Sequence, residues 1–157
     1  MLHATRLVLA LVLCAIPLRA LADEAAPKEG KIVFDVTEAD GKKLLGRIET
    51  IEETRQDLLR QGITPRIVVS FRGGATNLVQ TDLKKVKPKD RPYAAKIAAL
   101  LEQLGEAKGV DAIEQCAVAI RHAGTRAEDV LPPIKVVANS YVSLMSHQAQ
   151  GYAYIRP

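Results

Sequence analysis

Two cysteines are the residues of this chain best suited to covalent chemistry, and only one is predicted to remain in the mature protein. Cys14 lies inside an N-terminal apolar segment that has the features of a cleavable signal. Cys116 would then be a single thiol in an exported protein, where it cannot be half of an internal disulfide. Three interpretations of Cys116 follow: a small buried apolar residue, an intermolecular bridge, or a reactive sulfur.

The histidines give little support for a catalytic pair with that thiol. His122 follows Cys116 by six residues, which on a helix places it about 240° around the axis and off the face of the thiol. We therefore expect His122 to face solvent or to cap its helix. His147 lies off the apolar face of its predicted helix, so we expect it at the surface. Two histidines and one cysteine are too few for a preformed zinc site, and we predict no metal and no cofactor.

Residues 1–22 are predicted to be a secretory signal peptide. A short start with the cation Arg6 precedes an apolar run over residues 7–18, and Ala20-Leu21-Ala22 supplies small residues before a cleavage site. The apolar run is shorter than the roughly 20 residues that a membrane-spanning helix needs. We therefore predict a periplasmic protein with no membrane association after cleavage. A retained membrane anchor is the alternative.

Charge and composition argue against a nucleic-acid partner. Cleavage would remove Arg6 and Arg19, which lowers the formal net charge of +4 by two. The chain has no Trp, and aromatic residues make up 4% of it, so a surface on which bases or sugars stack is not expected.

After a polar lead-in at residues 23–30, strands and helices alternate through residues 31–157, which we predict to form one domain. Runs rich in β-branched residues predict strands at 31–37, 66–71, 110–115, 134–138 and 152–155. Apolar residues at helical spacing predict helices at 41–61, 93–108, 117–123 and after Asn139 or Ser140. The basic segment 77–91 is interrupted by prolines and is expected to be a loop or short helix, with a surface for an acidic partner as the alternative. The alternation predicts an α/β fold, with a parallel sheet and helices on both faces.

In such sheets, ligands bind at the carboxyl ends of the strands. Cys116 lies where a strand gives way to a helix, and the free amides of the helix start favour thiolate over thiol. Arg72 ends another strand and would add a positive charge if the two strands are neighbours. We therefore predict Cys116 as a catalytic residue and Arg72, Gly73, Gly74 and Asn139 as anion- or ligand-binding residues. A packed, inert Cys116 is the alternative, and the Gly73-Gly74 loop fits a structural turn better than a phosphate loop.

Five segments in a fixed order strengthen the sulfur interpretation: residues 31–36, 68–74, 109–116, 129–139 and 148–157. Together they resemble the DsrE/DsrF-like family of sulfur-relay proteins, in particular its exported, signal-bearing members. The resemblance covers nearly all of the predicted mature chain. It implies a three-layer α/β/α sandwich with a mainly parallel sheet of about five strands, and often a homo-oligomer.

The resemblance also implies a function for Cys116. In the family's characterised cytoplasmic members, a cysteine carries sulfur as a persulfide between partner proteins. Cys116 is at a strand-end position that matches a cysteine common in the exported group. This implies a persulfide carrier or sulfurtransferase-like protein whose partner is a sulfur donor or acceptor protein. Arg72 stands where a histidine is common, and an arginine can hold an anion but cannot shuttle protons.

Two other functions remain open at this point. The first is a non-enzymatic oligomeric binding module in which Cys116 is structural. The second is a small-ligand or nucleotide binder that uses the Gly73-Gly74 loop.

Overall fold

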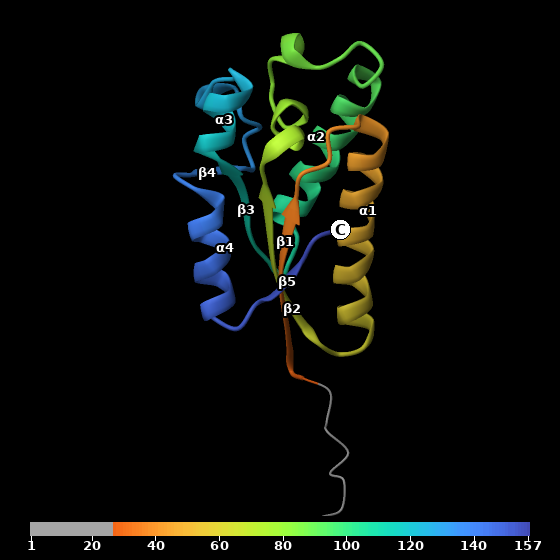
Figure 1. Ribbon diagram of the computed structural model, residues 1–157. Coiled ribbons are helices and arrows are strands. Elements are labelled where there is room, and N and C mark those ends of the chain that lie inside the picture. The colour runs from red at the N-terminus through yellow and green to blue at the C-terminus, as the bar shows by residue number, and fades with distance from the viewer. Residues whose placement is uncertain (1–26) are drawn as a thin grey trace, which may run out of the picture.

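The computed structural model describes residues 27–157, which form a five-stranded sheet between two layers of helices (Figure 1). The strand order is β4-β3-β2-β1-β5, and every neighbouring pair is parallel. The predicted three-layer α/β/α sandwich is thereby confirmed. The signal peptide predicted at residues 1–22 lies outside the described residues. Within residues 27–157, no helix is both long and apolar enough to span a bilayer.

The elements follow the predicted order along the chain. The strands are β1 (Glu29–Val36), β2 (Thr64–Phe71), β3 (Val110–Cys116), β4 (Lys135–Val137) and β5 (Ala153–Ile155). The helices are α1 (Gly41–Arg60), α2 (Arg91–Glu106), α3 (Ala117–Ala123) and α4 (Ser140–Ala149). Three short 3-10 helices lie at Gly73–Leu78, Leu83–Lys85 and Ala127–Asp129. The strand β1 begins at Glu29, inside the expected lead-in, because its pairing with β2 already starts at Glu29 and Thr64.

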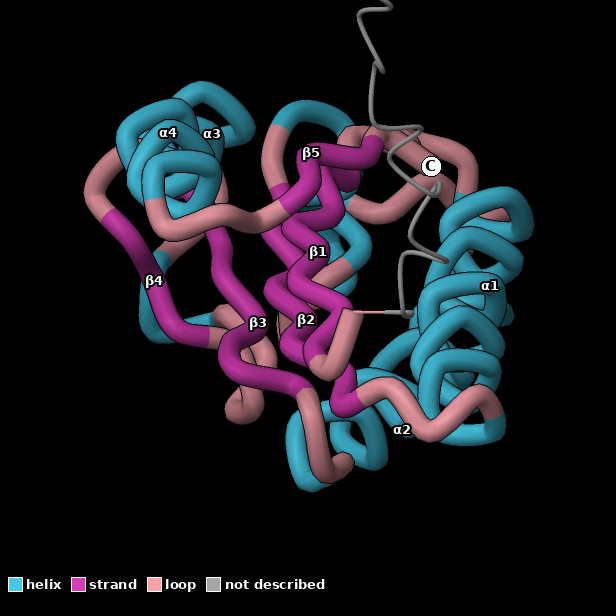
Figure 2. Tube along the Cα trace, turned by 90° about the horizontal axis from the view of Figure 1, so that it is seen from below, coloured by secondary structure: helices cyan, strands magenta, loops and turns pink. Residues whose placement is uncertain are grey.

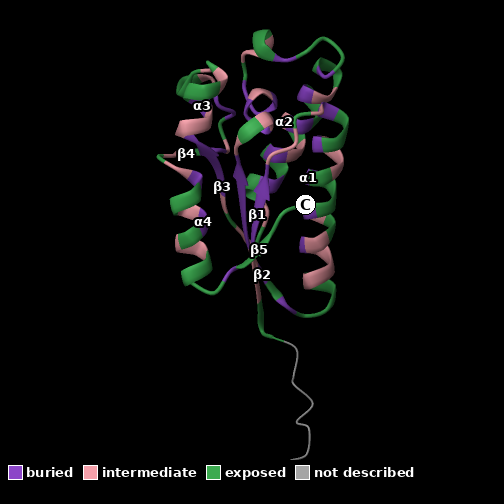
Figure 3. Cartoon of the chain, in the orientation of Figure 1, coloured by how far each residue is buried: buried purple, intermediate pink, exposed green. Residues whose placement is uncertain are grey.

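The two faces of the sheet are covered unequally. Helices α1 and α2 lie together on one face and helices α3 and α4 on the other (Figure 2). Most buried apolar residues, including Leu44, Phe71 and Ile97, belong to one large cluster with α1 and α2. A second, small cluster on the α4 side comprises Val33, Val68, Leu144 and Tyr152. The carboxyl-terminal halves of β1, β2 and β3 are buried between the layers, whereas β5 and much of α4 are exposed (Figure 3).

Alternation along the strands places polar residues on the α4 side. Val33 faces the small cluster while Phe34 belongs to the large one, so Asp35 points to the α4 side again. The same alternation places Ser70 of β2, two residues after Val68, on that side. In the sheet register Asp35 lies beside Ser70, and Ser70 lies beside Glu114. The carboxyl ends of three strands therefore present a buried polar row to α4.

Gly109 gives a test of how closely β2 packs against the start of β3. Its φ is 90°, and an added Cβ would lie 2.4 Å from Pro65 Cγ and 2.8 Å from the Pro65 carbonyl oxygen. We expect Gly109→Ala to lower the free energy of unfolding by about 1–3 kcal/mol. The matched control is Gly46→Ala within α1, where nothing lies within 4 Å of an added Cβ. That change should raise the free energy of unfolding by about 0.5–1 kcal/mol. Urea denaturation followed by circular dichroism measures both, and equal stabilities would contradict the close approach.

Candidate functional site

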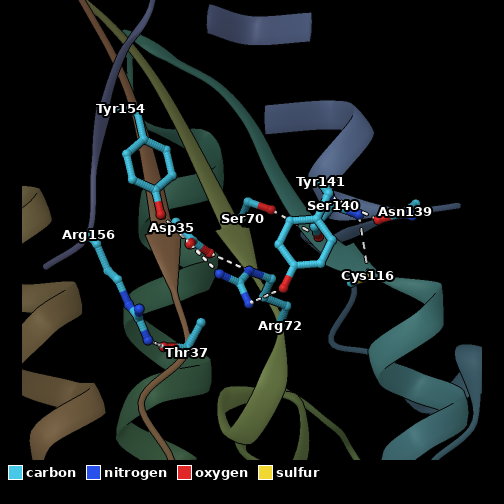
Figure 4. A network of polar contacts seen from close by, with 10 residues as sticks. All are labelled: Asp35, Thr37, Ser70, Arg72, Cys116, Asn139, Ser140, Tyr141, Tyr154 and Arg156. Carbon is cyan, nitrogen blue, oxygen red and sulfur yellow. Dashed lines mark hydrogen bonds and ion pairs between the residues drawn. The ribbon is translucent and has the colours of Figure 1, made fainter. Parts of the chain in front are cut away.

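Cys116 is the last residue of β3 and the N-cap residue of α3. Its side chain is directed at the start of α4, where the backbone N–H of Ser140 donates to Cys116 Sγ at 3.3 Å (Figure 4). This contact follows from the topology, since β4 pairs with β3 through Cys116 and Val137 and α4 begins shortly afterwards. The thiol is buried, with 4% of the residue exposed.

The surroundings of Cys116 act on its pKa in opposite directions. Burial raises the pKa of the Cys116 thiol, because it penalises the charged form. Hydrogen bonds from the backbone N–H groups of Ser140, Ala119 and Val118, and from the Ser140 side chain, lower it by more. The net pKa is below the usual value for a thiol. The beginnings of α3 and α4 thus both present donors to one sulfur atom, which favours thiolate.

A cavity of about 500 Å³ opens beside the thiol. Four of the five predicted site residues line it: Arg72, Gly73, Cys116 and Asn139. Gly74 is not among the lining residues. An added Cβ there would lie 2.4 Å from Ala39 Cβ, so this glycine allows the segment after β1 to pack closely. Asn139 caps α4 by accepting a hydrogen bond from the Tyr141 N–H at 2.9 Å.

Asn77, His122 and Tyr141 also line the cavity, and sequence reasoning had not assigned them to the site. His122 is exposed, as expected, and it lines the same cavity as the thiol. Cys116 has extended rather than helical backbone angles, φ −72° and ψ 119°, so its side chain does not follow the helical wheel of α3. Ala119 and His122 are three residues apart and share one face of α3. That face borders the cavity, although no hydrogen bond joins His122 to Cys116 in the described residues.

Arg72 is in the cavity wall, but its charge is already matched by a carboxylate. Its Nε donates to Asp35 Oδ1 at 2.7 Å and its Nη2 to Asp35 Oδ2 at 2.5 Å. These hydrogen bonds raise the pKa of Arg72. The strands β2 and β3 are neighbours, as the prediction for Arg72 required. Arg72 lines the same cavity as the thiol, but its Nε and Nη2 both donate to Asp35, so its positive charge is paired rather than free.

Two tyrosines extend this ion pair. Tyr154 of β5 donates its hydroxyl proton to Asp35 Oδ2 at 2.6 Å. Tyr141 of α4 accepts a hydrogen bond from Arg72 Nη1 at 3.2 Å, and its ring centroid lies 4.7 Å from the Arg72 guanidinium carbon. The network therefore joins β1, β2, β5 and α4 beside the cavity (Figure 4).

A second polar cluster lies under α4, and it overturns the expectation that His147 is at the surface. His147 Nε2 is 3.2 Å from Glu114 Oε1, and the Ser143 hydroxyl donates to Glu114 Oε2. The His147 ring also packs edge-on against Tyr152, with centroids 5.2 Å apart. The apolar residues of α4 predict the wrong buried side, because the helix turns Ser143 and His147 toward Glu114.

Across residues 27–157, no group of three or more His, Cys, Asp or Glu side chains is arranged to hold a metal ion. The cavity presents one thiol with backbone donors aimed at it.

Comparisons with known proteins give similarity without a function. No protein-family model matches the chain. An uncharacterized protein of Aquifex aeolicus (strain VF5) is 28% identical over 125 residues, which cover 80% of this chain and 55% of that protein. The chain thus spans little more than half of that relative. The solved structure of MTH1491, a protein of unknown function from Methanobacterium thermoautotrophicum, is similar with a TM-score of 0.61 and 25% identity, over 82% of this chain and all of the other.

The lowered pKa of Cys116 predicts its reactivity as a function of pH. Alkylation by iodoacetamide should reach half of its maximal rate at a lower pH in the native protein than in the urea-unfolded chain, because the thiolate is the reactive form. Cys116→Ser gives the background. A native midpoint at or above the unfolded one would contradict the role of the amide donors.

Ser140→Pro tests the α4 donor separately, because it removes the N–H that reaches Cys116 Sγ. Ser140 is the first residue of α4, and proline is well tolerated at this position of a helix. The matched control is Ser140→Ala, which loses the hydroxyl but keeps the N–H. We expect the alkylation midpoint to move to higher pH in Ser140→Pro than in Ser140→Ala.

The Asp35–Arg72 pair should contribute strongly to stability. Asp35 is fully buried and Arg72 exposes 18% of its side chain, so Asp35→Asn leaves a largely buried cation without its partner. We expect a loss of about 3 kcal/mol in the free energy of unfolding, measured by urea denaturation. Glu128→Gln is the control, since it breaks the exposed pair with Arg126 and should leave the unfolding midpoint nearly unchanged. Equal effects of the two changes would contradict a special role for the buried pair.

Proposed function

We propose that this protein is an exported, sulfurtransferase-like carrier that holds sulfane sulfur on Cys116. The observation that carries the proposal is the Cys116 thiol itself, placed beside a cavity with backbone donors from α3 and α4 that lower its pKa. The resemblance to the DsrE/DsrF-like family and the signal-like N-terminus support the same function and a periplasmic location. A sulfur donor or acceptor protein is the partner that the resemblance implies.

The chemistry needs only the thiolate and a sulfane donor. The Cys116 thiolate attacks the outer sulfur of a persulfide or of thiosulfate and forms a new S–S bond. The donor's own S–S bond breaks, and its remaining sulfur leaves with the electron pair as thiolate or sulfite. An acceptor thiolate then removes the outer sulfur by the same exchange and releases the Cys116 thiolate. No oxidant, reductant or metal is consumed.

The site residues have separate tasks in this scheme. The amides of α3 and α4 stabilise the anion on Cys116 before and after the exchange. Because the thiol pKa is already lowered, the first attack does not depend on a histidine base. Arg72 shapes the cavity wall through its pair with Asp35, and Asn139 fixes the start of α4 that donates to the sulfur.

Sulfur loading gives a direct test. The purified protein treated with thiosulfate, polysulfide or glutathione persulfide should gain about 32 Da for each added sulfur atom, by mass spectrometry. The addition should map to the peptide with Cys116, be removed by dithiothreitol, and be absent in Cys116→Ser. Absence of an adduct with all three donors would overturn the proposal.

One observation favours a second candidate, a non-enzymatic binding module with a structural Cys116. The residue is only 4% exposed, which is typical of cysteines that pack as small apolar residues. This candidate predicts slow labelling of the native thiol at every pH and unchanged behaviour of Cys116→Ala. Fast labelling with a lowered midpoint would exclude it.

A further inference from the structure

The cavity beside Cys116 presents side-chain donors that no residue within 27–157 uses. Asn139 accepts the Tyr141 N–H through its side-chain oxygen at 2.9 Å, and its amide NH2 group donates to no other described residue. The Tyr141 hydroxyl accepts from Arg72 Nη1 at 3.2 Å, which leaves its own proton free to be donated. Both residues line the cavity. Two unused donors in one wall favour a ligand with an acceptor such as a carboxylate.

Asn77 supplies an unused acceptor to the same cavity. It lies in the 3-10 helix that follows β2 and is one of the lining residues. Its side-chain oxygen is buried and accepts no hydrogen bond within the described part of the chain. Buried acceptors are nearly always paired, and rotation of the side-chain amide would turn this oxygen toward an N–H group of a ligand. The cavity therefore matches a molecule that carries both a carboxylate and an N–H donor.

The charge of the cavity and its rim favours an anion. The lining residues include Arg72 and His122 but no Asp or Glu. Arg121 precedes His122 in the last turn of α3, and an added Cβ at Gly124, which caps this helix, would lie 3.6 Å from Lys85 Nζ. Neither Lys85 nor Arg121 forms an ion pair in the described part of the chain. These two cations therefore raise the electrostatic potential near the cavity and attract an anionic ligand.

The volume of the cavity indicates the size of the ligand. About 500 Å³ is within the range of sites that enclose small organic molecules, and a thiosulfate ion would leave most of it empty. The side chains of Val118, Ala119 and Ala123 give it an apolar wall on α3. Cys116 is 4% exposed, so a partner protein's persulfide would have to enter the cavity together with the chain that carries it. A free molecule of amino-acid or short-peptide size meets all of these conditions.

We infer that the sulfur donor of this site is the persulfide of an amino-acid or short-peptide thiol, held in the cavity by its carboxylate and its amino or amide groups. The inference rests on the proposed function for the transfer step, in which the Cys116 thiolate takes the outer sulfur. The S–S bond of the donor breaks, and the small thiol leaves with the electron pair as its thiolate. Binding of the small thiol itself does not depend on sulfur transfer. A protein partner would then serve as the acceptor only.

Binding is tested without sulfur transfer by calorimetric titration of the Cys116→Ser protein with S-methylglutathione. Saturable binding is expected, and it should weaken several-fold when Asn77→Leu is added. The diethyl ester of the same peptide, which lacks free carboxylates, should bind more weakly. The double change Lys85→Gln and Arg121→Gln should weaken binding of the peptide but not of its ester. Absence of binding at millimolar peptide, or equal binding of peptide and ester, would overturn the inference.

The rate of sulfur loading tests the size of the donor. Loading of the wild-type protein, followed by mass spectrometry, should saturate as the concentration of glutathione persulfide is raised. Ala123→Leu narrows the cavity and should slow loading from glutathione persulfide several-fold more than loading from thiosulfate. The matched control is Ala99→Leu, at an exposed position of α2, which should leave both rates unchanged. Circular dichroism checks folding, and Ala119→Leu replaces Ala123→Leu if that variant is unfolded.

The results separate this inference from the proposed function. If Cys116 loads from every donor and Ala123→Leu slows all of them equally, the sulfur carrier stands and the small-thiol donor is overturned. If no donor loads Cys116, the carrier and the donor are both wrong. Binding of S-methylglutathione to Cys116→Ser would in that case still identify the cavity as a site for a small peptide.

Discussion

The buried ion pair between Asp35 and Arg72 is the interaction on which the arrangement of this end of the sheet depends. A carboxylate with no exposed surface is stable only when its oxygens are fully matched by donors. Arg72 supplies two of these donors and Tyr154 a third. The pair fixes the ends of β1 and β2, and through Tyr154 and Tyr141 it also holds β5 and α4. A substitution that breaks this pair would therefore also alter the cavity beside Cys116.

The same ion pair also affects the electrostatic environment of Cys116. Because Asp35 pairs with Arg72, the groups that lower the pKa of Cys116 are mainly backbone N–H donors, which carry no net charge that must be matched. Two of the three donor amides belong to α3 and one to α4. The lowering of the Cys116 pKa therefore depends in part on the position of α4 over the sheet. Burial and amide donation act against each other on the pKa, and the lowered value shows that donation prevails.

The polar underside of α4 links this site to the outer surface of the molecule. Glu114 is buried on β3 and needs the donors that Ser143 and His147 provide. These hydrogen bonds turn the polar side of α4 toward the sheet, and Tyr141, Val142 and Met145 are left exposed on its outer side. The same rotation of the helix aims the Ser140 amide at Cys116. A single helix orientation thus accounts for the thiol environment and for the exposed apolar surface.

The sequence alone determined the class of fold and the order of elements, because β-branched runs, helical spacing and capping residues such as Asn139 act over short distances. It also placed Cys116 and Arg72 at strand ends. Tertiary structure decided what those residues contact. Asp35 and Arg72 are 37 residues apart and Cys116 is 24 residues from its Ser140 donor, so their pairing follows from strand order, which local patterns do not encode. The rotation of α4 was decided in the same way, by the buried carboxylate of Glu114 on a neighbouring strand rather than by the helix's own apolar residues.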